Sequence, residues 1–340
     1  MKKQFLLVTL LILSLISCTK EHYIEDTPLD LSIELVFVAN EGNFGSSNGS
    51  ISVIGKDGVI QTVENVGDVV QSLLVNRDKL FVSVNNSHKI KVFDITTEGI
   101  LLPGIEIDTN GSSPREMTIV NNKLYFTNWN TQDVKILNLF TYDFETPISV
   151  NGLPESIIND GENIFVGIIM NQDYSDASEV LKINSNTNQI IQSYEVGYGP
   201  TSLLLKNKNL FVARTYYDDN WKAFYGTSQV DLTFDESTIS IMNYGSGVVC
   251  GGSIHSFKGD TYRSFQGGIA LLKEDLNINE QTLIGDTDSS NVYSVETIND
   301  KVYIGTYDGY VRVLNETNQE ISIYKVGEFP GDFEYWTNKK

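Results

Sequence analysis

The chain has 340 residues, with 44 acidic against 24 basic side chains and a formal net charge of −20. A field of that sign repels nucleic acids and anionic lipid surfaces, so we exclude both as partners. The length suffices for one closed domain of repeated units, preceded by a short leader.

The first 17 residues are a predicted export signal. Lys2 and Lys3 precede the apolar run 5–13, which is short for a membrane-spanning helix. The run leads into Leu-Ile-Ser-Cys at 15–18, which resembles the lipobox of bacterial lipoproteins. That resemblance implies lipidation at Cys18, with residues 18–33 as the lipidated cysteine and tether. An ordinary cleaved signal with a stray cysteine is the alternative. Lipidation of Cys18 leaves Cys250 without an intramolecular disulfide partner.

Residues 34–340 are built from one repeated phrase, clearest at 79–94, KLFVSVNNSHKIKVFD. An apolar triplet opens a strand, a polar loop turns the chain, and a second apolar strand follows. The phrase starts near residues 35, 79, 123, 163, 209, 261 and 301. Repeats of about 40 to 50 residues that each hold several short strands are typical of propeller blades. The sequence therefore predicts an all-β fold, a seven-bladed β-propeller with four-stranded antiparallel blades.

Links rich in glycine and proline join each repeat to the next strand. They end in Pro114, Pro154, Pro200 and Pro330, and proline is tolerated at the first position of a strand. By the usual order of a propeller, the strand after such a link is the innermost strand of the next blade. The last one, at 332–336, has no following repeat. We expect it to close the ring by completing the first blade, because an open ring exposes sheet edges.

The link, strand and turn phrasing resembles the YVTN-type (YncE-like) propellers over about residues 34–336. The segment 37–54, FVANEGNFGSSNGSISVI, is similar to the first blade of Bacteroidetes surface lipoproteins of the BtuG type. The segments around 225–228, 243–245 and 251–253 fit the same group. The resemblance implies an outer-membrane lipoprotein, anchored by lipid only and facing the cell exterior. It also implies cobalamin (vitamin B12) or a related corrinoid as a ligand rather than a cofactor, and a TonB-dependent transporter as partner.

Unusual residues collect in the loops expected on one face of the ring. The predicted ligand-binding residues are aromatic: Phe44, Trp129, Tyr174, Tyr198, Tyr216, Tyr217, Trp221, Tyr225, Tyr293 and Tyr307. Polar side chains, including Asn171, Asp218 and Asp219, are interleaved with them, and the loop 216–226 is the longest. The turns of the opposite face are mostly small and charged, with few aromatic residues beyond Phe140 and Tyr142. Since one aromatic side chain can bury ~150–250 Å², the collection favours a large, flat ligand decorated with amides. Packing of some rings between blades is the alternative.

Enzymatic hypotheses have less support. The three histidines, His22, His88 and His255, show no metal-ligand spacing, and the chain has no Gly-x-Ser-x-Gly nucleophile motif. Glu41, Glu155, Asp68 and Asp332 could imitate the calcium site of propeller lactonases. We therefore predict a non-enzymatic surface lipoprotein without a resident cofactor or metal, and the resemblance implies that its ligand is a corrinoid. The remaining hypotheses are another cargo, a protein-interaction scaffold and, last, a calcium-dependent hydrolase.

Overall fold

The computed structural model describes residues 32–234, 237–247 and 252–339. Residues 33–340 form one compact unit. The predicted signal, Cys18, His22, most of the tether and Cys250 lie outside the described residues. No helix in the described part of the chain is long and apolar enough to span a membrane.

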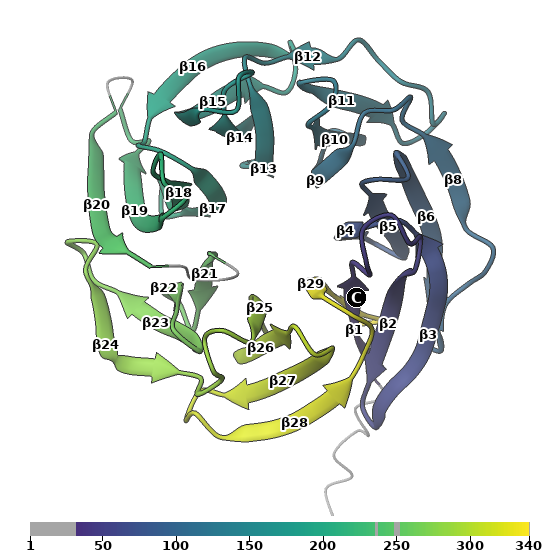
Figure 1. The fold of residues 1–340 in the computed structure, drawn as a ribbon. Helices are drawn as coiled ribbons and strands as arrows, with labels where there is room; N and C mark the ends of the chain where they lie inside the picture. The colour runs from purple at the N-terminus through teal and green to yellow at the C-terminus, as the bar shows by residue number, and fades with distance from the viewer. Residues whose placement is uncertain (1–31, 235–236, 248–251, 340) are drawn as a thin grey trace, which may run out of the picture. The chain divides into compact units, whose positions relative to one another are not determined.

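Seven antiparallel sheets stand around a common centre, as Figure 1 shows. From the innermost strand outward, the first three blades are β29 (Pro330–Thr337), β1 (Glu34–Asn40), β2 (Gly49–Gly55), β3 (Gly58–Gly67); β4 (Val70–Asn76), β5 (Lys79–Val84), β6 (Lys89–Thr96), β7 (Gly99–Ile100) with β8 (Ile105–Asp108); and β9 (Pro114–Val120), β10 (Lys123–Asn128), β11 (Asp133–Asn138), β12 (Ile148–Ser149). Blades four and five are β13 (Leu153–Asn159), β14 (Asn163–Met170), β15 (Asp176–Asn184), β16 (Gln189–Glu195); and β17 (Pro200–Lys206), β18 (Asn209–Tyr217), β19 (Ala223–Asp231), β20 (Ile239–Ser246). Blades six and seven are β21 (Ile254–Phe257), β22 (Asp260–Phe265), β23 (Gly268–Leu272), β24 (Ile278–Ile284); and β25 (Val292–Ile298), β26 (Lys301–Thr306), β27 (Tyr310–Asn315), β28 (Glu320–Lys325). The predicted seven-bladed, four-stranded propeller is confirmed.

The ring is closed by its two ends, as predicted. Strand β29 pairs with β1 from Glu34 opposite Thr337 to Asn40 opposite Pro330, and so supplies the innermost strand of the first blade. Beyond the strands, the backbone amide of Ile33 donates to Asn338 Oδ1 at 2.8 Å. The closing strand is longer than the predicted 332–336, because its pairing runs past both ends of that segment.

The repeated apolar triplet is explained by its place in the blade. Leu80, Phe81 and Val82 of β5 are all buried, because neighbouring sheets cover both faces of a second strand. A strand buried on both faces is expected to be a continuous apolar run. Full burial of each such side chain contributes about 1.5–3 kcal/mol. The outermost strand β28, by contrast, is largely exposed.

Hydroxyl groups join neighbouring blades near the centre. Ser83 Oγ donates to the carbonyl of Arg115 at 2.8 Å, and Thr127 Oγ1 donates to that of Glu155 at 2.7 Å. In each pair the donor lies on a second strand and the acceptor on the innermost strand of the next blade. These bonds satisfy buried backbone carbonyls that the sheets leave free.

Two outer strands differ from the regular pattern. The outer edge of the second blade is divided between β7 and β8, and that of the third blade is the two-residue β12 with a bridge between Leu137 and Phe144. Both irregular edges follow turns at the ends of third strands.

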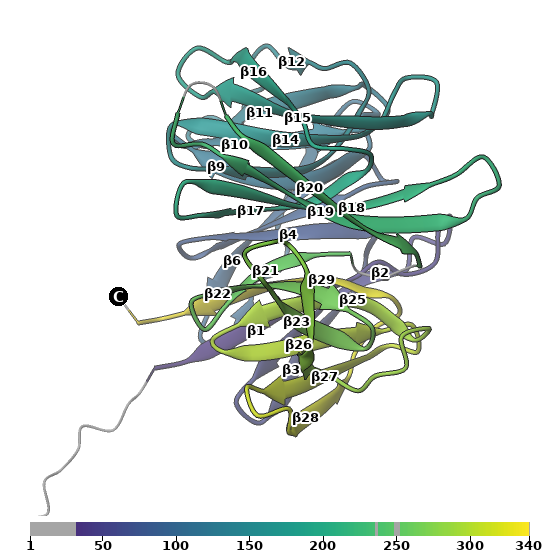
Figure 2. The ribbon, with the colours of Figure 1, turned by 90° about the vertical axis from the view of Figure 1, so that its left-hand side faces the viewer.

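The ring has two distinct faces. The loops between second and third strands and the links into each innermost strand emerge on one of them, which we call the loop face. Chain entry at Ile33 and exit at Asn338 lie together on the opposite one, the terminal face. Figure 2 shows the long β18–β19 hairpin projecting on the side away from the C-terminus.

Candidate functional site

The predicted aromatic residues lie in loop-face loops or in the strand ends that meet them. The structure groups most of them into four sets of ring contacts. These are Tyr198, Tyr216 and Phe224; Tyr217 with Trp221; Tyr225 with Tyr244; and Tyr293, Tyr307 and Phe329 near the ring centre. Phe44 and Tyr174 lie outside these sets and are largely exposed. The ten residues therefore do not form a single site.

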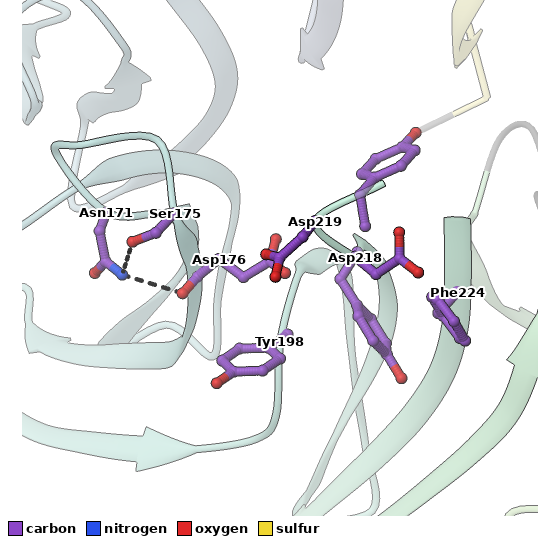
Figure 3. A pocket seen from close by; sticks show the side chains of 9 residues that line it. Asn171, Ser175, Asp176, Tyr198, Asp218, Asp219 and Phe224 are labelled. Atoms are coloured by element: carbon purple, nitrogen blue, oxygen red, sulfur yellow. Dashed lines mark hydrogen bonds between the residues drawn. The ribbon is translucent and has the colours of Figure 1, made fainter. Parts of the chain in front are cut away.

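Tyr198, Tyr216, Tyr217 and Phe224 line a pocket on the loop face. The pocket has a volume of about 710 Å³ and opens between the fourth and fifth blades. Its lining is Asn171, Ser175, Asp176, Tyr198, Tyr216, Tyr217, Asp218, Asp219 and Phe224, as Figure 3 shows. Aromatic surface and hydrogen-bonding oxygens thus face the same space, the usual composition of a small-molecule site.

A glycine link places Tyr198 at this pocket. Gly199 has a φ of +69°, and a Cβ there would lie 1.9 Å from the carbonyl oxygen of Thr215. Only glycine combines that backbone conformation with so close an approach. The amide of Thr215 donates to the carbonyl of Gly199 at 2.9 Å, which fixes the link against β18. Tyr198 then meets Tyr216 edge-on, with ring centroids 6.1 Å apart.

The hairpin that carries the other rings is held by its own turn. Asp218 Oδ1 accepts hydrogen bonds from the backbone amides of Asn220 and Lys222, each at 2.9 Å. Trp221 has a φ of +59° in this turn and is 81% exposed. The turn therefore leaves the Trp221 indole largely exposed to solvent, beside the ring of Tyr217.

Two carboxylates repel each other across the boundary between the blades. The pKa of Asp176 is raised, first because the group is partly buried and further because of the negative charge of Asp219. A backbone hydrogen bond from Tyr217 partly opposes this shift. A ligand that brings N–H donors to this edge relieves the repulsion.

Two buried arginines lie against the aromatic rings of the fifth blade. Arg214 donates from Nη2 to Asn243 Oδ1 at 2.6 Å, and its guanidinium lies 5.7 Å from the ring of Tyr216. Arg263 lies over Tyr225 and Tyr244, and burial lowers its pKa to about 10. Both arginines remain charged at neutral pH. They stabilise the aromatic rings through hydrogen bonds to backbone carbonyls and through cation–π contacts.

A group of interacting polar and aromatic side chains lies at the mouth of the central channel. Arg115 makes a two-pronged ion pair with Glu155, at 2.9 and 2.5 Å, and stacks 4.3 Å from the ring centre of Trp129. The buried indole N–H of Trp129 has no hydrogen-bond partner in the structure. Burial raises the pKa of Glu41, while a hydrogen bond with Tyr293 lowers it. Trp129 and Tyr293 thus belong to the channel mouth and not to the pocket.

Deeper in the channel, β29 carries two carboxyl groups with displaced pKa values. Burial raises the pKa of Asp332 to about 7 and that of Glu334 to about 8, and the negative charge of Glu296 adds to both shifts. The pKa of Glu116 is also raised by burial and by the charge of Asp332. The channel is therefore lined by carboxyl groups that hold their protons to higher pH than usual.

Of the acidic residues considered for calcium, Glu41, Glu155 and Asp332 lie near one another at the channel, since the charge of Glu155 raises the pKa of Glu41 and that of Glu41 raises the pKa of Asp332. Asp68 accepts hydrogen bonds from the Gly45 amide and the Asn86 side chain at 2.9 and 2.6 Å, away from the channel. Glu155 is engaged by Arg115. Among the described residues, no three His, Cys, Asp or Glu side chains are placed to hold a metal ion.

Sequence reasoning missed two lining residues, Ser175 and Asp176. They follow the turn that begins at Asn171, whose Nδ2 donates to Ser175 Oγ and to the carbonyl of Asp176, both at 3.0 Å. The unusual length of the fourth repeat's loop was the available signal. It gave no indication that the loop reaches the hairpin of the next blade.

No known family model and no curated protein matches this sequence. Solved structures do match the fold. The structure of apo AztD from Citrobacter koseri is 11% identical, covers 90% of this chain and 99% of its own, and has a TM-score of 0.59. A functionally unknown protein from Desulfotomaculum acetoxidans is 12% identical over 88% of this chain and 98% of its own, with a TM-score of 0.63. BamB from Moraxella catarrhalis is 13% identical over 87% and 84%, with a TM-score of 0.54. These likenesses show the propeller fold alone.

Proposed function

We propose that the protein is a non-enzymatic surface lipoprotein that binds cobalamin or a related corrinoid on its loop face. It hands this ligand to a TonB-dependent transporter of the outer membrane. The anchor is the lipid on Cys18, and the loop face points to the cell exterior. The observation that carries the proposal is the pocket between the fourth and fifth blades, where aromatic rings and oxygen acceptors line one space.

The chemistry of a corrinoid suits this lining. Its macrocycle is broad and flat, and primary amides project from its edge. Tyr198 and Tyr216 offer ring surface for the flat part, and burial of aromatic contacts supplies most of the binding energy in such sites. Asp176 and Asp219 offer acceptors for amide N–H groups, which relieves their mutual repulsion. The pocket holds one edge of so large a ligand, and the rest lies over the loop face.

Exposed rings beyond the pocket support the hand-off. Trp221 and Phe44 are 81% and 77% exposed on the loop face. Exposed aromatic side chains of this kind are frequent anchors of protein interfaces. A transporter that meets this face would approach the bound ligand directly.

The test is calorimetry of the mature chain at micromolar concentration with cyanocobalamin. We expect saturable heat with one ligand per chain. A porphyrin edged with carboxylates is the matched control, and we expect it not to bind because its charges meet Asp176 and Asp219. Absence of heat and of any thermal shift with cyanocobalamin would contradict the proposal. Equal binding of the porphyrin would support a flat macrocycle as the class of ligand but would contradict a specific site for the corrinoid.

A further inference from the structure

The terminal face carries exposed hydrocarbon side chains at several places on its rim, among them Phe234 of the fifth blade, and one group of them belongs to the first three blades. Leu101 and Leu102 are 54% and 57% exposed in the segment between β7 and β8, and Phe140 is 82% exposed beyond the end of β11. Ile60, near the start of β3, is also exposed. We call these four residues the apolar rim. They come from the outer edges of the first three blades, and none carries a polar atom in its side chain.

Local packing forces the two leucines outward. A Cβ on Gly104 would lie 2.5 Å from the Phe93 ring, so the chain passes close against the second blade at that point. The amide of Leu101 donates to the carbonyl of Asp94 at 2.9 Å. Between these two attachments, Leu102 has no blade surface to cover it.

The rim is continuous with the place where the chain enters the propeller. Ile33 packs on the buried cluster that contains Ile95 and Ile100. Ile100 directly precedes Leu101 in the sequence. The side chain of Gln61 makes two hydrogen bonds with the backbone of Ile100, at 2.9 and 2.8 Å. These bonds hold β3, which carries Ile60, beside the segment of the two leucines.

We propose that the apolar rim rests on a lipid bilayer and that its side chains enter the membrane interface. The inference rests on the proposed anchor at Cys18. Fourteen residues separate Cys18 from Ile33, and a flexible chain of that length has a typical reach of about 20 Å. The anchor thus keeps the entry point, and the rim beside it, close to the lipid. The propeller then stands with its terminal face on the membrane and its loop face directed outward.

The attraction is apolar and not electrostatic. The chain has a net charge of −20, which opposes an anionic surface. Two lysines near the rim form ion pairs, Lys79 with Asp94 at 2.6 Å and Lys123 with Glu145 at 2.7 Å, whereas Lys56 in the turn before β3 is exposed. Adjacent exposed leucines with a nearby phenylalanine are a common apolar contribution to interfacial binding. The lipid surface we infer is therefore zwitterionic in its outer headgroups.

The test places a spin label at single positions of the lipidated mature chain on phosphatidylcholine vesicles. Leu102→Cys and Trp221→Cys, both with Cys250→Ser, compare the rim with the loop face. For each label, the measured quantity is its accessibility to oxygen divided by its accessibility to a water-soluble relaxant. We expect this ratio to be at least tenfold higher at position 102 than at position 221. Equal accessibility at the two positions overturns the inference. A label at 102 that is already shielded without vesicles also overturns it, because a segment of the chain then covers the rim.

A second arm separates the rim from the anchor. Unlipidated mature chain, made as Cys18→Ser, is sedimented with the same vesicles beside the variant Leu101→Ser/Leu102→Ser/Phe140→Ser. We expect weak sedimentation that the triple change reduces at least fivefold, with corrinoid affinity unchanged. Sedimentation that is absent, or insensitive to the triple change, contradicts the rim. Mass spectrometry of Cys18 reports on the anchor independently, and corrinoid calorimetry reports on the proposed function.

Discussion

The loop face and the terminal face expose apolar surface of different chemistry. On the loop face the exposed rings are mostly tyrosine and tryptophan, such as Tyr198 and Trp221, which carry a polar atom beside their apolar surface. On the terminal face the rim exposes leucine, isoleucine and phenylalanine. Amphipathic rings suit a ligand that has both ring surface and hydrogen-bonding edges, whereas bare hydrocarbon suits lipid.

The difference also follows from the topology of a blade. Loop-face loops connect strands near the centre, so side chains from neighbouring blades meet there and can share a pocket. The terminal face carries the turns between first and second strands and, at the periphery where the blades diverge, the turns between third and fourth strands. A patch on that rim can touch a flat surface but cannot enclose a ligand.

The largest effect is expected from opening the ring. Deleting residues 331–340 removes most of β29, including the buried Phe333 and Trp336, and uncovers the inner edge of β1. Loss of large buried rings costs several kcal/mol each, so we expect a melting temperature lower by at least ~10 °C, or aggregation. Deleting 339–340 alone is the control. An unchanged melting temperature in the long deletion would exclude this closure.

The channel should make stability depend on pH. Folding raises the pKa of Asp332 to about 7 and of Glu334 to about 8, above the ordinary value of about 4. The folded chain therefore holds protons that the unfolded chain releases. This stabilisation is complete below about pH 4 and is lost as the pH rises to about 8. We expect the free energy of unfolding to fall by roughly 2–4 kcal/mol between pH 5 and pH 8.

Urea unfolding at several pH values measures this dependence. Asp332→Asn with Glu334→Gln keeps the shape of both side chains and removes their titration. The double variant should show a clearly flatter profile over the same range. A wild-type profile that rises with pH, or a variant profile as steep as wild type, would show that these groups do not hold their protons.

Truncating two rings of the loop face should weaken corrinoid binding. Tyr198→Ala with Trp221→Ala removes contact surface at the pocket and beside it, and we expect a loss of about 30-fold in affinity, or ~2 kcal/mol. Asn186→Ala, in a turn away from this face, should change affinity less than about twofold. Calorimetry compares the three proteins. Binding that survives the double truncation unchanged would keep the ligand and reject the site.

The smallest effect concerns the two carboxylates at the blade boundary. Asp219→Asn removes a negative charge from the surroundings of Asp176, so the raised pKa of Asp176 should move down toward its ordinary value. NMR titration of the Asp176 carboxyl carbon measures this shift. The part due to burial should remain. No change in that titration would show that the charge of Asp219 does not act on Asp176. Asp219 would then not belong to the edge that we assign to ligand amides.

Much of the fold could be predicted from the sequence because second strands are covered on both faces. Runs such as Leu80–Val82 are apolar for that reason, and their spacing gives the number of blades. Ring closure followed from counting strands. The irregular outer edge at β7 and β8 could not be predicted, because peripheral strands are exposed and their pairing is weakly constrained.

The site was less accessible to sequence reasoning. Position along a repeat places a side chain on the loop face, but its angle around the ring decides what it meets. Trp129 and Tyr225 are predicted ligand contacts, and the structure packs each beside a buried or half-buried arginine, away from the other predicted rings of the pocket. Asp176 reaches the pocket through a contact between blades that no local pattern encodes.

Hydrogen exchange with and without cyanocobalamin tests the division between the faces most directly. At saturating ligand we predict slower exchange in residues 171–176, 197–199 and 217–222, which surround the pocket. Residues 99–104 and 138–143, around the rim, should exchange at the same rate in both samples. Protection at the rim, or no protection near the pocket while ligand is bound, would contradict the assignment of ligand binding to the loop face.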